Sequence, residues 1–358
     1  MFDFVGKFHY YPNKVAQFIR GNYDQTLATV LLYLGSGMCN HDCIYCDKNF
    51  YEVKPLVFSV EFLDQLIEDM VQLGADSLVI LGEGAEPLLS PNLCHIIENA
   101  TRRGIVCGLY TNGSIASDEM VAVLNNLNFL RVSLDAGSRE THQTIHRYSR
   151  SLPFFDNALA LLKKIDKTRV NTGASYIVMK ENVGEIFQTW KILDEIGVAF
   201  LELKLALQEG YVFKDIDTNL MEEMRRQIGR INVCRDSSTK LVLNNHLKML
   251  MSDNGHNASV LTIQDEVPCY TSVFRTIVSP LGYYLCSPRK NTSDAKYGDP
   301  FKETLKEAWC GSRRKQMVGR MCSIRCTYCH QNRALQGLVN GLELPPSNCA
   351  TEEQCHFL

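Results

Sequence analysis

Short apolar and β-branched runs alternate with amphipathic helical patterns over residues 28–205, and this alternation limits the folds open to the chain. Six strand–helix units imply a parallel sheet with right-handed crossovers. Because polar segments follow the strand ends, we expect an α/β fold, a partial (β/α)6 TIM-like barrel rather than a flat doubly wound sheet. The six predicted strands are Ala28–Leu34, Ser77–Leu81, Ile105–Tyr110, Phe129–Leu134, Thr172–Met179 and Phe200–Leu205.

Start and stop signals frame the helical patterns. Ser59 precedes apolar residues at helical spacing and Gly74 follows them, as an N-cap and a C-terminal glycine do. Beyond about residue 215 the alternation stops. We expect five segments: an extension over 1–27, the barrel over 28–215, a helical connection over 216–265, a cysteine-rich module over 266–340 and a tail over 341–358. In the module we predict a hairpin of Phe274–Ser279 with Tyr283–Cys286.

The composition excludes several classes of protein. The 358 residues are 45% hydrophobic with a net charge of −3, which argues against nucleic-acid binding because that needs a basic surface. No apolar stretch approaches the ~20 residues of a membrane span, and the first residues lack a signal-peptide pattern. We therefore expect a soluble cytoplasmic protein that binds neither nucleic acid nor membrane.

Fourteen cysteines are many for a reducing compartment, where clustered thiols indicate metal rather than disulfides. Cys39, Cys43 and Cys46 follow the first predicted strand, with no fourth cysteine nearby. Three thiolates suggest a 4Fe–4S cluster with one open iron, because such clusters usually have four. Zinc is the alternative, although zinc sites usually pair two C-x2-4-C knuckles. We interpret His41, inside the loop, as a bystander.

The C-x3-C-x2-C spacing, with the aromatic Tyr45 before the last cysteine, resembles the signature of the radical SAM superfamily. The resemblance implies that these cysteines hold a 4Fe–4S cluster whose open iron is chelated by S-adenosylmethionine (SAM). One electron then splits SAM into methionine and a 5′-deoxyadenosyl radical, which abstracts a hydrogen atom from the substrate. A reducing partner such as flavodoxin or ferredoxin is implied as the electron source.

Further segments at predicted strand ends agree with this resemblance. Ser133 and Asp135 resemble the family's serine–leucine–aspartate segment, whose side chains face the SAM or substrate cavity, and Asn182 resembles the asparagine after the next strand. The segment after the second strand resembles the glycine-glycine-glutamate-proline motif that receives the SAM amino group; we favour Glu86 over Glu83 as the acceptor. This segment consists of Gly84, Ala85, Glu86 and Pro87.

The downstream cysteines resemble the auxiliary-cluster module called twitch, the shorter form of the SPASM domain. The resemblance implies at least one auxiliary 4Fe–4S cluster, and its ligands would be Cys269, Cys286, Cys326 and Cys329. Cys322 creates a second C-x3-C-x2-C and is an alternative ligand, and a zinc knuckle over 322–329 is the structural alternative. A second auxiliary cluster would draw on Cys310, Cys349 and Cys355.

The reaction outcome and the substrate stay open at this point. An oxidation needs an electron acceptor such as the auxiliary cluster, whereas an epimerisation needs a hydrogen-atom donor, for which Cys322 and Cys310 are candidates. We expect a small polar substrate of a natural-product pathway: a sugar, an aminocyclitol or a nucleoside. A peptide is the alternative, although the 38 residues before Cys39 are too few for a leader-peptide recognition domain. A non-catalytic iron–sulfur carrier is the alternative from another class, and Lys204 is a further polar candidate at a strand end.

Overall fold

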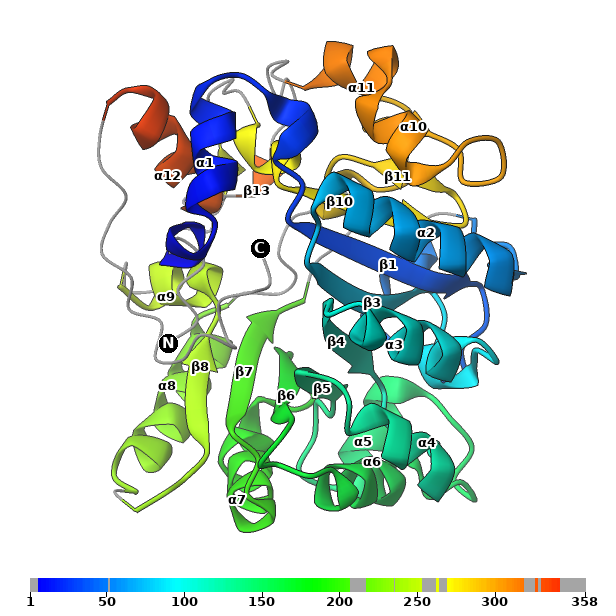
Figure 1. The fold of residues 1–358 in the computed structure, drawn as a ribbon. Helices are drawn as coiled ribbons and strands as arrows, with labels where there is room; N and C mark the ends of the chain where they lie inside the picture. Colours follow the sequence, from blue (N-terminus) through cyan, green and yellow to red (C-terminus); the bar gives the residue numbers. More distant parts are fainter. Residues whose placement is uncertain are drawn as a thin grey trace.

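The computed structural model describes residues 6–50, 52–206, 217–234, 236–252, 262–263, 269–318, 326–327 and 330–341. Its centre is a curved sheet with the strand order β12-β11-β10-β1-β3-β4-β5-β6-β7-β8 (Figure 1). Neighbouring strands from β1 to β7 pair in parallel, which confirms the six predicted strands and the α/β barrel-like class. These strands are β1 (Thr29–Ser36), β3 (Ser77–Glu83), β4 (Val106–Thr111), β5 (Phe129–Ser133), β6 (Asn171–Val178) and β7 (Phe200–Leu205).

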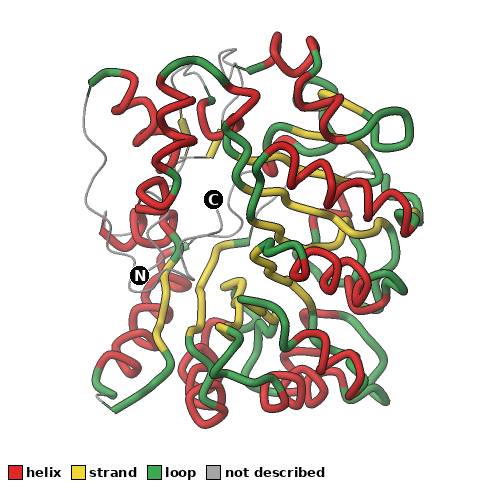
Figure 2. The backbone as a smooth tube through the Cα atoms, viewed as in Figure 1, coloured by secondary structure: helices red, strands yellow, loops and turns green. Residues whose placement is uncertain are grey.

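Helices cover the outer face of this sheet, as the red tubes around the yellow strands show in Figure 2. Alternate strand residues such as Leu78 and Ile80 are fully buried in the core between sheet and helices. The predicted caps are confirmed, because Ser59 accepts a hydrogen bond from the backbone of Phe62 and Gly74 is left-handed. The helices are α2 (Val60–Leu73), α3 (Leu93–Arg102), α4 (Asp118–Leu124), α5 (Arg139–His146), α6 (Phe154–Lys164) and α7 (Ile186–Ile196).

The strand–helix alternation continues for one unit beyond the end that the sequence predicts. After α8 (Thr218–Asn232), β8 (Lys240–Leu243) pairs in parallel with β7, and α9 (Asn245–Ser252) follows. The expectation that the alternation stops near residue 215 is therefore wrong. The strand is missed because it has only four residues and begins with an exposed lysine, which leaves almost no periodic signal.

The predicted C-terminal hairpin forms and joins the same sheet. It consists of β10 (Arg275–Ser279) and β11 (Gly282–Tyr284), and β12 (Lys296–Gly298) continues it antiparallel. Because β10 pairs in parallel with β1, the hairpin extends the barrel sheet directly. Next along the chain are α10 (Leu305–Cys310), which packs on α2 through a hydrogen bond from the Lys306 backbone to Asp69, and α11 (Ser312–Met317).

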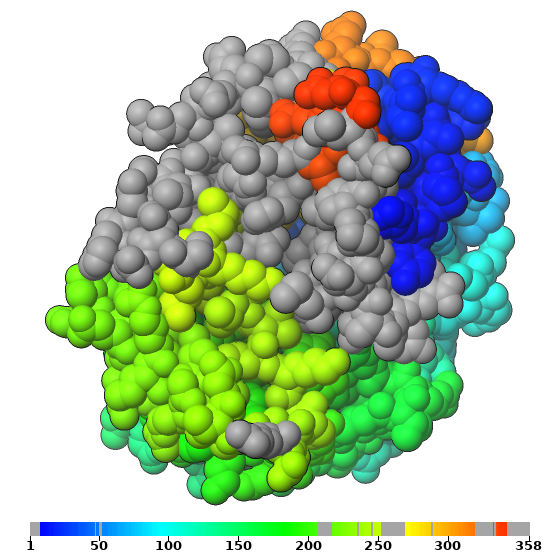
Figure 3. All heavy atoms as spheres, turned by 90° about the vertical axis from the view of Figure 1, so that its left-hand side faces the viewer, coloured from blue at the N-terminus to red at the C-terminus, as the bar shows by residue number. Residues whose placement is uncertain are grey.

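The N-terminal extension packs against the cysteine-rich segment. The rings of Phe8 and Phe18, from η1 (Gly6–Tyr10) and α1 (Pro12–Ile19), lie within 5.4 Å of Phe274. Figure 3 shows α12 (His330–Val339, red) beside this blue segment, and Leu335 joins the same cluster. None of the helices in the described ranges is long and apolar enough to cross a membrane.

The remaining short elements connect these parts. Two-residue strands pair as β2 (Leu56–Val57) with β1 and as β13 (Cys326–Thr327) with β9 (Thr262–Ile263). The short 3-10 helices are η2 (Tyr23–Gln25), η3 (Asp47–Phe50), η4 (Pro87–Leu89), η5 (Val183–Glu185), η7 (Tyr270–Val273) and η8 (Ser287–Arg289).

The inner face of the sheet carries the strand residues that alternate with the core residues, and we call it the lumen face. Aromatic rings fill its amino-terminal end. A Cβ on Gly173 would lie 2.0 Å from the Phe200 ring, so this ring rests on the β6 backbone. Phe129 packs edge-on against Tyr110 at 5.2 Å. The base of the lumen is thus closed by packed rings.

We expect Gly173→Ala to destabilise the protein by about 1–3 kcal/mol, because the added methyl overpacks this base. Gly229→Ala is the matched control. Gly229 lies inside α8 with no atom within 4 Å of its added Cβ, so alanine there should stabilise by about 0.4–1 kcal/mol. Urea unfolding measures both changes, and equal shifts would contradict the packing of Phe200 on Gly173.

Candidate functional site

The loop that carries Cys39, Cys43 and Cys46 leaves the carboxyl end of β1 and is held on two sides. On one side the backbone N–H of Asp42 donates to the carbonyl of His146 at 2.9 Å. On the other side the Asn40 amide donates to the Ser114 hydroxyl at 2.8 Å. All three cysteines are partly exposed, so the loop presents their thiols at the edge where the strands end.

The separation of the three sulfurs tests which metal group the loop fits. Within the described part of the chain, the one group of three ligand atoms that all lie within 4.8 Å of one another is His41, Cys43 and His146. The three cysteine sulfurs are therefore spread more widely. A single zinc ion with Zn–S bonds of about 2.3 Å would hold its sulfurs about 3.8 Å apart. Sulfurs that do not all lie within 4.8 Å of one another are spread too widely for one such ion and leave room for a larger group such as a 4Fe–4S cluster.

Ionisation of these thiols depends on the group that they bind. Burial raises the pKa of Cys39 to about 12, and the neighbouring Glu86, Cys43 and Cys46 add to the rise. A thiolate is the form that ligates metal, so binding must displace the proton.

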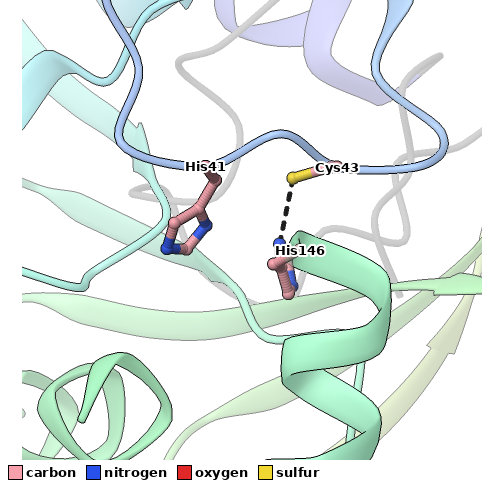
Figure 4. A group of neighbouring side chains, drawn as sticks. All are labelled: His41, Cys43 and His146. Carbon is pink, nitrogen blue, oxygen red and sulfur yellow. Dashed lines mark hydrogen bonds between the residues drawn. The ribbon is translucent and has the colours of Figure 1, made fainter. Parts of the chain in front are cut away.

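Three buried histidines, His41, His142 and His146, lie close together at the cysteine loop, and Figure 4 shows two of them, His41 and His146, beside Cys43. His41 stacks on Tyr148 at 5.2 Å, and its ring lies 5.0 Å from that of His146. Burial, together with the charges of His146 and Lys48, lowers the pKa of His41 to about 3. The third ring, His142, is held by a 2.7 Å hydrogen bond with the Tyr148 hydroxyl. His41 is therefore a packed, neutral ring, and its interpretation as a bystander stays a prediction.

His146 connects the cysteine loop to the end of β5. Its Nδ1 lies 3.1 Å from the Cys43 sulfur, and its Nε2 lies 3.3 Å from an oxygen of Asp135. Burial would lower the pKa of His146, but the Cys43 and Asp135 charges raise it to about 10. The Tyr45 hydroxyl donates to the same Asp135 oxygen at 2.6 Å. The buried Asp135 carboxylate therefore contacts the cysteine loop directly at Tyr45 and, through His146, at Cys43.

Glu86 lies in a polar cradle that links the segment after β3 to the end of β4. Its carboxylate accepts hydrogen bonds from the Thr111 hydroxyl and from the Asn112 backbone N–H, the latter at 2.8 Å. Burial raises the pKa of Glu86 to about 7, although these hydrogen bonds act in the opposite direction. Gly84 has φ 56°, and a Cβ there would lie 2.9 Å from the Lys48 side chain, so this segment touches the cysteine loop.

Glu83, the competing acceptor, already has a cationic partner. Its side chain is fully buried and accepts from Lys290 Nζ at 2.6 Å and from Asn291 Nδ2 at 3.1 Å. Lys290 follows η8, directly after the C-terminal hairpin. The Tyr33 hydroxyl also lies 3.3 Å from that of Ser287. The chain after β11 therefore enters the lumen and is anchored there.

The other predicted residues at strand ends have mainly internal partners. Asp135 is left-handed at φ 54°, and its second oxygen accepts from the Ile177 backbone at 2.6 Å. The buried Asn182 side chain donates to the carbonyls of Asp135 and Ile177. Ser133 stays partly exposed on the lumen face. Asp135 and Asn182 thus fix the backbone around the site rather than face an open cavity.

The predicted auxiliary ligands are described only in part. Cys269 caps η7 and Cys286 caps η8, and both are partly exposed. Cys326 starts β13, while Cys322 and Cys329 lie outside the described residues. One described contact links the segment at Cys269 to the helix that follows Cys329. The Asn332 side chain, from α12, accepts from the Tyr270 backbone at 2.6 Å, directly beside Cys269.

The structure does not bring Cys310 to the site. It ends α10, and its side chain packs against the core between the sheet and the outer helices. Burial raises the pKa of its thiol, and the charges that act on it come from Asp24, Lys315 and other residues of that outer layer. Cys310 as a hydrogen-atom donor is therefore not supported, because the sheet separates it from the lumen.

Two features of the site were missed from the sequence. His146 lies four residues after His142 on α5, and this helical spacing was the available signal for a shared face. The second feature is the charged group on the lumen face, where Arg131 pairs with Glu202 and Lys204 lies 3.2 Å from Glu202. The strand alternation marks these residues as inward facing, but it does not show which of them meet.

Residues 33–191 match the family model described as the Radical SAM superfamily. The match begins in β1 and ends in α7, so it contains the cysteine loop, the Glu86 segment and Asp135. The chain therefore carries a radical SAM domain. Proteins of this family bind a 4Fe–4S cluster and SAM.

The curated relatives that the chain matches have low sequence identity to it. The Fe-coproporphyrin III synthase of Methanosarcina barkeri is 27% identical over 233 residues, which are 63% of this chain and 53% of that protein. The AdoMet-dependent heme synthase of the same organism is 27% identical over 44% of this chain and 45% of its own length. The chain spans about half the length of these relatives. Streptococcus suis SuiB bound to precursor peptide SuiA has a TM-score of 0.65 at 13% identity, over 84% of this chain and 68% of SuiB, which shows a shared fold.

We expect Lys290→Met to destabilise the protein by about 3–5 kcal/mol, because it leaves the buried Glu83 carboxylate without its cation. The double variant Glu83→Leu with Lys290→Met removes both charges and should recover most of that loss. Lys302→Met is the control, since Lys302 forms an exposed pair with Asp299 and should change stability by less than about 0.5 kcal/mol. Chemical unfolding gives all three values. A double variant as unstable as the single one would show that the pair does not anchor the segment.

Proposed function

We propose that this protein cleaves SAM reductively and uses the resulting radical to abstract a hydrogen atom from a substrate held in the lumen. The observation that carries the proposal is the loop at the carboxyl end of β1, which holds Cys39, Cys43 and Cys46 next to the Glu86 cradle. Bound there, the cluster would supply the electron that splits SAM into methionine and a 5′-deoxyadenosyl radical.

The residues of the chain would position SAM and keep the site in shape. The segment Gly84–Pro87 would receive the SAM amino group, and Glu86 is the proposed acceptor because Glu83 is already paired with Lys290. A carboxylate with three donors keeps room for one more, and an ammonium partner would favour its charged form. Tyr45 and Asp135 would hold the cysteine loop at its distance from β5.

We also propose one auxiliary 4Fe–4S cluster of the twitch type. The ligands would be Cys269, Cys286, Cys326 and Cys329. The contact of Asn332 with Tyr270 supports this, since it joins the helix that starts just after Cys329 to the residue after Cys269. Such a cluster would accept the second electron in an oxidation. Epimerisation is the redox-neutral outcome and would require a hydrogen-atom donor, for which Cys322 remains the candidate.

For the substrate we propose a small polar molecule, a sugar, aminocyclitol or nucleoside. Polar groups on β5, β6 and β7 support this class, because serine, arginine, glutamate and lysine side chains lie on that part of the lumen face. A tetrapyrrole is a second candidate, favoured by the names of the 27%-identical synthases of Fe-coproporphyrin III and heme. A peptide is the third class to be tested.

Anaerobic reaction of the reconstituted protein with dithionite and SAM tests the activity. We expect 5′-deoxyadenosine and methionine, and a correct substrate should raise their rate. Sugars, aminocyclitols, nucleosides, a coproporphyrin and peptides form the panel. Intact clusters without any 5′-deoxyadenosine would instead support a non-catalytic iron–sulfur carrier.

Iron analysis tests the two proposed cluster sites separately. Replacing Cys39, Cys43 and Cys46 together by alanine should abolish SAM cleavage and leave roughly four irons per chain. About no iron, with zinc present, would assign the downstream cysteines to a zinc knuckle. A control with Cys94→Ala, far from either group in sequence, should keep the full iron content.

Replacing His146 by leucine should make the reduction potential of the SAM-binding cluster more negative. A donor to a ligand sulfur stabilises the negative charge that grows on reduction, and His146 lies 3.1 Å from Cys43. Redox titration followed by electron paramagnetic resonance measures the shift. His142→Leu is the matched control, because His142 is equally buried but bonds Tyr148. Equal potentials in both variants would contradict the role of His146.

A further inference from the structure

Four side chains on the lumen face form a charged layer above the aromatic base. We define this layer as Tyr110 on β4, Arg131 on β5, and Glu202 and Lys204 on β7. Their strand neighbours, such as Leu130 and Leu203, are in the core between sheet and helices, so alternation directs the four toward the lumen. Figure 1 shows β4, β5, β6 and β7 side by side along one wall.

The contacts within the layer concentrate on one carboxylate oxygen. The Arg131 guanidinium donates to Glu202 Oε2, and Lys204 Nζ lies 3.2 Å from the same oxygen. The guanidinium also stacks 3.7 Å above the centre of the Tyr110 ring. These contacts hold both cations in place, and the layer is therefore preorganised rather than a pair of mobile surface side chains.

The layer carries one more positive than negative charge. Arg131 and Lys204 share the single carboxylate of Glu202, and all three side chains are largely buried, at 14%, 24% and 6% exposure. The next carboxylate toward the site, Asp135, already accepts from Tyr45 and from the Ile177 backbone. Burial and the Arg131 charge lower the pKa of Lys204 to about 8, although the charges of Glu202 and Asp135 act in the opposite direction.

Two hydroxyl groups lie at the level of Glu202, between the levels of Arg131 and Lys204 along the strands. Ser133 follows Arg131 on the same face of β5 and stands opposite Ser175 in β6, which in turn stands opposite Glu202. The Ser175 hydroxyl lies 3.4 Å from that of Ser133. A molecule bound at this layer would meet two cations and, between their levels on β5 and β6, neutral hydrogen-bonding groups.

We propose that the charged layer binds an acidic group of the substrate, a carboxylate or a phosphate. This inference rests on the proposed function, and it narrows the substrate class. A second anion beside Arg131 and Lys204 would balance the charge of the layer and form charge-assisted hydrogen bonds in a site with little water. An aminocyclitol would bring an ammonium group to two cations, so the layer disfavours it and favours an acidic sugar or a nucleotide.

Paired probes that differ only in an acidic group test the proposal. The pairs are glucose with glucose 6-phosphate, glucose with glucuronate, and uridine with uridine monophosphate. Calorimetric titration into the reconstituted protein with SAM should give at least one pair in which the acidic member binds about tenfold more tightly or better. The pair in which the acidic member binds more tightly shows whether the layer prefers a phosphate or a carboxylate. No preference in any pair overturns the proposal.

Two variants locate the preference in the layer. Arg131→Gln and Lys204→Met should each raise the Kd of the acidic probe about tenfold and leave that of its neutral partner within about twofold. Lys240→Met is the control, since Lys240 is an exposed lysine on the neighbouring strand β8, and it should change neither. Circular dichroism checks that the variants fold. If Arg131→Gln does not fold, the affinities of Lys204→Met alone test the proposal.

The affinity for SAM distinguishes the substrate from SAM as the molecule whose acidic group binds the layer. The Kd of SAM should stay within about twofold in both variants, because its carboxylate is proposed to bind at the iron. A large loss of SAM affinity with unchanged probe binding would assign the layer to SAM and overturn the proposal. Formation of 5′-deoxyadenosine by the wild-type protein is measured on the same preparation. If no 5′-deoxyadenosine forms, the proposed function is wrong. If it forms but the acidic probes bind no more tightly than the neutral ones, only the proposed binding of an acidic group by the charged layer is wrong.

Discussion

The parallel pairing of β1 on both of its edges is the constraint on which the rest of the structure depends. One edge pairs with β3 and builds the barrel, and the other pairs with β10 and attaches the cysteine-rich segment. Because the cysteine loop leaves the carboxyl end of this shared strand, it lies between the two parts. A loop on an edge strand would have barrel residues on one side only. The position of β1 therefore makes a site with two walls.

Buried polar groups then set the distances between these walls. Asp135 binds Tyr45 from the cysteine loop and the backbone of β6, and Glu83 binds Lys290 from the chain after β11. Each pair would be costly to break, because a lone buried charge has no water to compensate it. Such contacts stabilise a single arrangement of loops more than they add to overall stability. They are suited to holding a cofactor and a substrate at fixed positions.

The lumen divides into layers of different chemistry. Packed rings at Phe129 and Phe200 fill the amino-terminal end, the charged layer extends from the level of Phe200 toward the carboxyl ends of the strands, and the cysteine loop leaves the carboxyl end of β1. This order would let a substrate be recognised by its charge at one end and react at the other. A neutral or acidic layer at this position would select different molecules with the same fold, which is consistent with the low identity between proteins that share it.

The sequence by itself determined the six parallel strands, the caps at Ser59 and Gly74, and the cysteine loop, because strand period, cap chemistry and ligand spacing are local properties. Local patterns also place Arg131 and Lys204 on the inner face. Only the tertiary structure decided which of these groups meet. Lys290 reaches Glu83 across 207 positions of the chain, and no periodicity reports such a contact. The pairing of β10 with β1 and the approach of His146 to Cys43 are of the same kind, since they result from how the whole sheet curves and closes.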